Sequence, residues 1–143
     1  MNGLRKRTSV NESGFTLVEL LVVMLIIGLL AAIAIPSFFN QRDKANDAEA
    51  KSTVNTAQTA IETYATSNDG EYTGATVAAL AGIEKTLDAP ALTVTVTADG
   101  YVISAAATRT GNTFTIERFD TGQVQFRCTA PGTGGCPDSG FWD

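Results

Sequence analysis

The stretch GFTLVELLVVMLIIGLLAAIAIP, residues 14–36, determines how the rest of this chain is interpreted. As an α-helix, Phe15 to Ile35 would extend roughly 31 Å, which matches the hydrocarbon core of a bilayer, about 30 Å thick. Glu19 is the one charged residue in this apolar run. Because a carboxylate inside a membrane helix is costly, its presence calls for a function. The stretch therefore predicts a helix that can cross a membrane and that carries one functional acid.

A short segment with three basic residues, Arg5, Lys6 and Arg7, precedes the apolar run. An ordinary secretory signal is one alternative, since residues 32–34 read Ala-Ile-Ala and resemble its cleavage site. However, its apolar core would be longer than the usual 7 to 15 residues, and Glu19 would lie inside it without purpose. A permanent membrane anchor that forms no filament is a second alternative. Basic residues on the two sides of the run nearly balance, so they do not fix its orientation.

Residues 14–36 resemble the class III signal of type IV pilins and pseudopilins, most like that of a bacterial major pilin of type IVa. The resemblance implies that a membrane peptidase cuts between Gly14 and Phe15 and methylates Phe15, with the N-terminus in the cytoplasm. Glu19 matches the family's buried glutamate, which faces the N-terminal amine of a neighbouring subunit in the filament. Gly28 and Pro36 match its helix-weakening positions. The resemblance is close over about the first fifty residues and is architectural beyond them.

The Glu19 carboxylate gains a natural partner once the chain is cut. The new amine of Phe15 would lie one helical turn away, on the same subunit or on a neighbour. In a packed apolar bundle an unpaired buried charge is strongly unfavourable. Glu19 is therefore predicted to select the subunit spacing at which amine and carboxylate meet.

Composition narrows the possible functions. The formal charge is −5, and removing residues 1–14, whose charges sum to +2, leaves −7. An acidic surface argues against binding nucleic acid. The absence of histidine excludes Ser-His and Cys-His catalysis and histidine-containing zinc sites. We expect no enzyme activity, no cofactor and no metal, and we interpret Asp120, Asp138 and Asp143 as solvated because they form no EF-hand pattern.

The apolar run should continue into an amphipathic half, giving one helix from Phe15 to Asn68. Val54, Ala57, Ile61 and Tyr64 follow helical spacing and predict a stripe that packs on the rest of the chain. Pro36 predicts a kink or local melting, and Gly28 adds weakness. Asn68-Asp69-Gly70 is a typical helix stop. The charged residues of this half are assigned to solvent: Arg42, Asp43, Asp47, Glu49 and Lys51.

The remaining residues predict a small antiparallel sheet. A short helical turn is expected at Thr76–Ala81, followed by strands at 92–98, 101–107, about 114–119 and 123–127. Asp99-Gly100 predicts a type I′ hairpin turn. In the fourth strand, Val124 and Phe126 should face inward. The fold class is therefore α+β, with the helix covering one face of four strands.

Cys128 and Cys136 lie close together near the end of the chain. A disulfide between them would stabilise so small a domain by roughly 2.6 kcal/mol in the loop-entropy model. Two free thiols are the alternative, whereas zinc is disfavoured because no further cysteine or histidine completes a site. A C-terminal disulfide loop is also similar to that of many pilins.

Together these features predict three regions: a cleaved leader at 1–14, a membrane and filament-core helix at 15–35, and a head at 36–143. The resemblance implies a structural subunit that polymerises into an extracellular type IV pilus-like filament. Its partners would be further copies of itself, the prepilin peptidase, an assembly ATPase and platform proteins, and the inner membrane before assembly. A type II secretion pseudopilin and a competence pilin for DNA uptake are alternatives. So is a soluble enzyme or binding domain released after Ala34.

Overall fold

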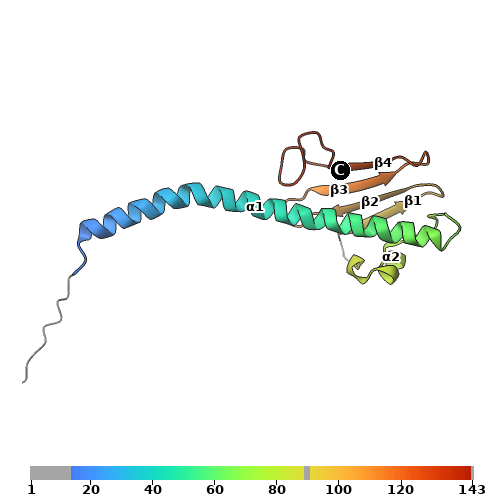
Figure 1. Ribbon diagram of the computed structural model, residues 1–143, viewed down its shortest axis with the longest axis horizontal. Coiled ribbons are helices and arrows are strands. Elements are labelled where there is room, and N and C mark those ends of the chain that lie inside the picture. The colour runs from blue at the N-terminus through green and yellow to red at the C-terminus, as the bar shows by residue number, and fades with distance from the viewer. Residues whose placement is uncertain (1–13, 89–90, 143) are drawn as a thin grey trace, which may run out of the picture. The chain divides into compact units, whose positions relative to one another are not determined.

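The computed structural model describes residues 14–88 and 91–142. The predicted leader therefore lies, except for Gly14, outside the described residues, as does Asp143. The chain divides into two compact units, Met1–Ser37 and Phe38–Asp143. The elements, in chain order, are α1 (Leu17–Thr66), α2 (Val77–Ile83), the 3-10 turn η1 (Lys85–Leu87), β1 (Leu92–Val96), β2 (Tyr101–Ala106), β3 (Thr113–Arg118) and β4 (Val124–Cys128) (Figure 1).

Helix α1 begins and ends within two residues of the predicted bounds. Its first turn is capped by Thr16, whose Oγ1 accepts a 3.2 Å hydrogen bond from the Glu19 N–H. At the other end, the Gly70 N–H donates to the Ala65 carbonyl at 2.9 Å, and Gly70 adopts a φ of 87°. That left-handed conformation favours glycine and confirms the predicted stop. Gly28 and Pro36 both lie inside α1, which is not interrupted at either residue.

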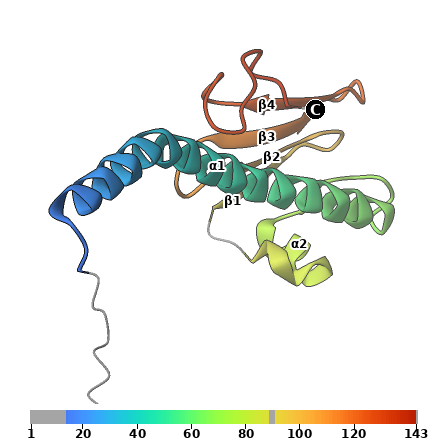
Figure 2. The same ribbon diagram turned by 60° about the vertical axis from the view of Figure 1, so that its left-hand side comes forward.

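The four strands form one antiparallel sheet in the order β1-β2-β3-β4. The part of α1 that belongs to the second unit lies across one face of this sheet, as Figure 2 shows. The core between them contains Val54 and Ile61 of α1 and Ile103, Phe114 and Ile116 of the strands, all fully buried. This α+β arrangement confirms the predicted fold class.

The hairpin between β1 and β2 differs from the prediction. Val96 pairs with Tyr101, and the Thr97 N–H donates to the Gly100 carbonyl at 2.9 Å, so Ala98 and Asp99 form the centre of the turn. Gly100 is required for another reason. A Cβ on it would lie 2.5 Å from the Arg118 carbonyl oxygen of the neighbouring strand. The glycine therefore permits a close backbone approach and does not supply a positive φ.

Two side-chain placements were predicted wrongly. Asp47, assigned to solvent, is fully buried. Val124, expected to face inward, is 36 % exposed because it begins the edge strand β4 and pairs only with Arg118. Phe126 is partly buried and packs on the core, as predicted. The fold positions two features of interest: an apolar N-terminal segment, and a head whose loops are bonded to α1.

Candidate functional site

The apolar N-terminal segment is exposed along its length. Its best 18-residue window has a mean hydropathy of 2.9, with none of that window buried. Phe15, Met24 and Ile33 are each more than 70 % exposed, and the large apolar side chains between Leu17 and Ile35 are likewise exposed. An apolar surface of this extent is unstable in water and marks a membrane span or an interface. By length and composition the segment can cross a bilayer.

The predicted cleavage bond lies just outside helix α1. Gly14, Phe15 and Thr16 precede the first helical residue, Leu17. A Cβ on Gly14 would meet no atom of the described residues within 4 Å, and Gly14 has no positive φ. The fold itself therefore gives no reason for glycine at this position. The same is true of Gly28, whose surroundings are also open.

Thr16 and Glu19 form a contact that the sequence reasoning missed. The spacing Thr-x-x-Glu is a capping box, in which a threonine hydroxyl accepts from the backbone N–H three residues later. This bond is present at 3.2 Å, and the Thr16 carbonyl also accepts from the Leu20 N–H at 3.3 Å. The signal was visible in the sequence, since Thr16-Leu17-Val18-Glu19 matches the motif directly.

In the head, Asp47 joins α1 to two loops. Its Oδ1 accepts from the Thr110 hydroxyl, and its Oδ2 accepts from Asn112 Nδ2 at 2.7 Å and from the Gly135 N–H at 2.8 Å. These donors belong to the β2–β3 loop and to the C-terminal loop. Because both carboxylate oxygens are hydrogen-bonded, burial of this side chain is tolerated.

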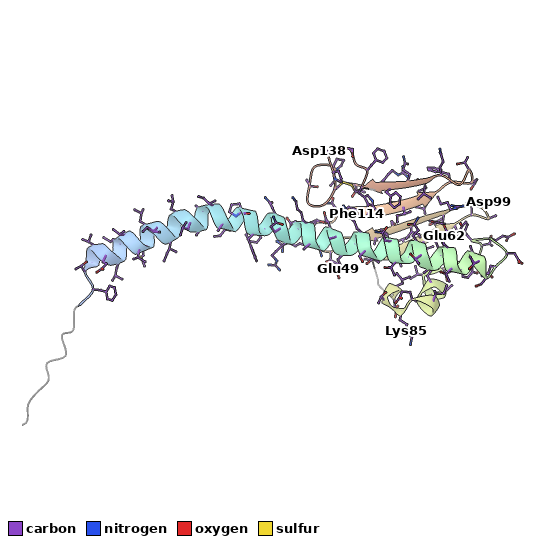
Figure 3. All side chains as sticks on the ribbon, in the orientation of Figure 1. Glu49, Glu62, Lys85, Asp99, Phe114 and Asp138 are labelled. Atoms are coloured by element: carbon purple, nitrogen blue, oxygen red, sulfur yellow. A yellow bond between two sulfur atoms is a disulfide. The ribbon has the colours of Figure 1, made fainter. Side chains whose placement is uncertain are left out.

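Lys51, one turn further along α1, binds the same C-terminal loop. Its Nζ donates to the Gly135 carbonyl at 2.6 Å and lies 5.2 Å from the centre of the Phe114 ring (labelled in Figure 3). The Trp142 ring lies on the same ammonium group at 5.5 Å, and its Nε1 donates to the Arg127 carbonyl at 2.7 Å. The loop itself is closed by a disulfide between Cys128 and Cys136, which confirms the predicted bridge.

Glu62 of α1 forms a second hydrogen-bonded cluster, at the end of the sheet opposite the β2–β3 loop. It accepts hydrogen bonds from the Tyr101 hydroxyl at 2.9 Å and from the Tyr72 hydroxyl at 3.0 Å. Burial raises the pKa of Tyr101, and it also raises the pKa of Tyr72, with the bond to Glu62 adding to both. Both phenols are thus held in their protonated, hydrogen-bond-donating form. This cluster is suited to stabilising the fold.

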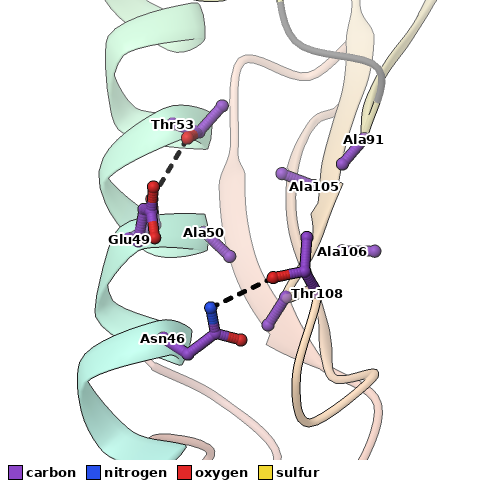
Figure 4. Close-up of a pocket in the computed structure, with 9 residues that line it drawn as sticks. Asn46, Glu49, Ala50, Thr53, Ala91, Ala105, Ala106 and Thr108 are labelled. Atoms are coloured by element: carbon purple, nitrogen blue, oxygen red, sulfur yellow. Dashed lines mark hydrogen bonds between the residues drawn. The ribbon is translucent and has the colours of Figure 1, made fainter. Parts of the chain in front are cut away.

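A shallow groove of about 180 Å³ lies between α1 and the sheet (Figure 4). Small side chains, including Ala50 and Ala105, line much of it, and Asn46 donates across it to the Thr108 hydroxyl at 3.3 Å. Across residues 14–88 and 91–142, no three His, Cys, Asp or Glu side chains gather in a way that could hold a metal. The groove offers no set of catalytic groups.

The comparisons with known proteins agree with the geometry of the N-terminal segment. Residues 10–35 match the family model for the prokaryotic N-terminal methylation motif. The chain is 40 % identical over 63 residues to the type IV major pilin protein PilA of Myxococcus xanthus, a match covering 44 % of this chain and 29 % of that protein. No solved structure matches the chain.

Two further relatives differ in their described roles. The type II secretion system core protein G of Escherichia coli is 28 % identical over 113 residues, which are 77 % of this chain and 74 % of that protein. The competence protein ComGC of Halalkalibacterium halodurans is 36 % identical over 59 residues, or 41 % of this chain and 58 % of that protein. The similarity to the M. xanthus and H. halodurans proteins thus spans less than two thirds of their length.

Proposed function

We propose that this chain is a member of the family of type IV pilins and pseudopilins and the structural subunit of a type IV pilus-like filament, because its N-terminal segment matches the methylation motif and its relatives include pilins and a pseudopilin. The observation that carries the proposal is the exposed apolar face of α1. That surface first lies in the membrane as part of the precursor. In the filament it is buried against the same segment of neighbouring copies, and the hydrophobic effect drives the association.

Processing removes residues 1–14 and leaves Phe15 as the methylated N-terminus. Two observations support this step. The Gly14–Phe15 bond precedes the helix, so a peptidase can bind it in an extended form, and Phe15 is 79 % exposed. Among the described residues nothing packs against Gly14, which is consistent with a glycine that is recognised by the peptidase.

Glu19 sets the register between subunits by pairing with the Phe15 amine. In the uncut chain the Glu19 backbone is already fixed by the Thr16 cap. The capped turn therefore fixes the backbone of Glu19 one helical turn from the point at which cleavage creates the amine. Gly28 and Pro36 serve in assembly, since the open space around Gly28 allows a neighbouring helix to approach closely.

The head, residues 36–143, covers the outside of the filament and performs no catalysis. The lack of histidine and the structural character of the relatives support a non-enzymatic role. The proposed partners are further copies of this chain, the prepilin peptidase, an assembly ATPase and platform proteins. The precursor resides in the inner membrane, and the filament lies outside the cell.

A type II secretion pseudopilin is the second candidate. It is favoured by the match to the E. coli core protein G, which extends over 77 % of this chain and so includes the head. A pseudopilus would use the same processing and the same Glu19 register but would remain a short structure in the cell envelope. A competence pilin is a third candidate, supported by the similarity to ComGC.

The decisive experiment is mass spectrometry of the N-terminal peptide, combined with imaging of filaments from cells that carry the gene, lack it or have it restored. We expect a methylated Phe15 and filaments that depend on the gene. Replacing Glu19 with Ala should abolish filaments while the protein still accumulates in the membrane. A mature chain that starts at Ile35 would contradict the proposal, as would normal filaments from the Glu19 variant.

A further inference from the structure

We propose that the head carries a lipid-headgroup-binding surface made of Phe38, Phe39, Arg42 and Arg109, here called the basal patch. It would hold the head against the phosphates of the bilayer before the subunit is extracted. The proposal rests on the membrane-anchored precursor of the proposed function and adds a specific contact to it. All four residues belong to the second compact unit.

The two aromatic rings of the basal patch are exposed, and an arginine lies over each. Phe38 is 61 % exposed and Phe39 is 47 % exposed. The Arg42 guanidinium carbon lies 5.9 Å from the Phe38 ring centre, and that of Arg109 lies 5.7 Å from the Phe39 ring centre. A guanidinium stacked on a ring directs its N–H groups to the edge of the ring, where those that are not bonded within the protein can bind phosphate.

Arg109 comes from the β2–β3 loop and is fixed to α1 by two bonds. Its Nε forms a 2.7 Å ion pair with Asp43, and its backbone N–H donates to Asn46 Oδ1 at 2.8 Å. The side chain remains 39 % exposed. Helix and loop therefore present their arginines together, and a lipid surface bound by both would constrain the orientation of the whole head.

Asp43 neutralises Arg109 through its ion pair, so the net positive charge of the basal patch comes from Arg42, which forms no ion pair among the described residues. Asp43 is the partner of Arg109, and Asp47 is buried with both oxygens bonded. Glu49 is exposed but lies about two helical turns beyond Arg42. One further exposed acid, Asp138, is carried by the C-terminal loop (Figure 3).

Acids gather instead at the other end of the sheet. The strand register places the β1–β2 and β3–β4 turns at the end opposite the β2–β3 loop. Asp99 and Asp120 occupy those two turns, and Thr97 donates to Asp120 at 3.3 Å across them. Asp69 and Glu71 follow α1 at this same end, where Tyr72 N–H donates to the Ala98 carbonyl at 3.3 Å. This charge distribution favours an anionic surface on the side of the basal patch.

The position of the basal patch in the sequence indicates lipid as the occupant. Phe38 follows Ile35, the last residue of the apolar run, by three positions, and Arg42 follows by seven. Side chains directly after a membrane span lie at the interface, where an apolar ring can enter the headgroup layer and an arginine can extend its guanidinium to lipid phosphate. A second copy of the chain is the competing occupant, and the test below separates the two.

The test uses the full chain inserted, at low protein density, into phosphatidylcholine vesicles with and without phosphatidylglycerol. Hydrogen exchange of the β2–β3 loop, residues 107–112, reports contact at the basal patch. We expect slower loop exchange in the anionic vesicles and loss of this protection at high salt. Arg42→Gln should reduce the protection about fivefold, the effect of one arginine near an anionic surface, whereas Arg42→Lys should retain most of it. Lys85→Gln, which removes a cation from η1, is the matched control and should change nothing.

Equal loop exchange in the two kinds of vesicle would overturn the lipid proposal. Protection that rises with protein density but ignores lipid charge would also overturn it, in favour of a second copy. Flotation of the protein with the vesicles is measured in the same samples. A chain that does not float would contradict the membrane-anchored precursor of the proposed function, so the two failures are distinguishable.

Discussion

The backbone N–H of Gly135 donates a 2.8 Å hydrogen bond to Oδ2 of Asp47, a residue 88 positions earlier in the chain. A Cβ on Gly135 would lie 3.0 Å from the Asp47 Cβ, so the loop can approach the helix this closely only as glycine. Asp47 thus bonds the disulfide loop to α1, while its other contacts bond the β2–β3 loop. The carboxylate is the point where three segments of the head meet.

Replacing Asp47 with Ala should destabilise the head by about 3 kcal/mol, because the Asn112 amide and the Gly135 N–H lose their acceptor in a buried site. Urea unfolding of the full chain in detergent, followed by the fluorescence of Trp142, measures this change. The matched control is Glu49→Ala, an exposed acid on the same helix, which should alter the free energy of unfolding by less than about 0.5 kcal/mol. Similar effects of the two variants would show that Asp47 is not a structural centre.

The Asp47 placement also shows what sequence reasoning could and could not supply. Residues 47, 50, 54, 57 and 61 follow helical spacing, and all five are buried. By helical spacing alone, Asp47 belongs to the stripe of α1 residues that packs against the sheet. It was assigned to solvent by its residue type, because the three donors that make its burial tolerable come from loops that no local pattern connects to the helix.

Local sequence patterns were sufficient to predict the secondary-structure elements and the disulfide. The helical stripe, the alternation in Leu92–Val96 and the closely spaced cysteines predicted α1, the sheet and the disulfide. The β1–β2 turn was not predictable in this way. The Asp99-Gly100 dipeptide favours a type I′ turn locally, but the Arg118 carbonyl of β3 decides where the glycine is needed.

Gly100→Ala should therefore destabilise the head, by about 2 kcal/mol or more. The new methyl group would lie 2.5 Å from a backbone carbonyl that is fixed in the sheet, so β2 or β3 must move. Gly82 offers the matched control, since a Cβ there meets nothing within 4 Å and the residue lies in α2. Gly82→Ala should be neutral or stabilising by up to about 1 kcal/mol. Thermal unfolding of both variants gives the comparison, and a harmless Gly100→Ala would refute the close-approach argument.

The tyrosine pair predicts a loss of stability at alkaline pH. Burial raises the pKa of Tyr101 above its ordinary value of about 10, with Glu62 adding to the rise, so the unfolded chain releases this proton first. The stabilising contribution is complete below about pH 10 and is lost as the pH rises further. Tyr101→Phe should cost about 1 kcal/mol at neutral pH through the lost bond to Glu62, yet show a shallower decline above pH 10.

Denaturant unfolding across this pH range, with phenolate absorbance recorded in parallel, measures both effects. Tyr72→Phe should keep most of the alkaline decline, because Tyr101 is still present. If Tyr101→Phe declined as steeply as the unmodified chain, another group would be responsible.

The disulfide and Asp47 should act together, because the disulfide closes the loop whose Gly135 amide binds the carboxylate. Replacing both Cys128 and Cys136 with Ser should cost about 2.6 kcal/mol by the loop-entropy model. In a loop that is no longer closed, the Gly135 N–H is not held at Asp47, and Asp47→Ala should then cost less than it does in the unmodified chain. A double-mutant cycle should give a coupling of at least about 0.5 kcal/mol. The cycle of the same cysteine replacements with Tyr101→Phe, at the other end of the head, should be additive. Additivity in both cycles would mean that the loop stays bound to α1 without its disulfide, through its bonds to Asp47 and Lys51.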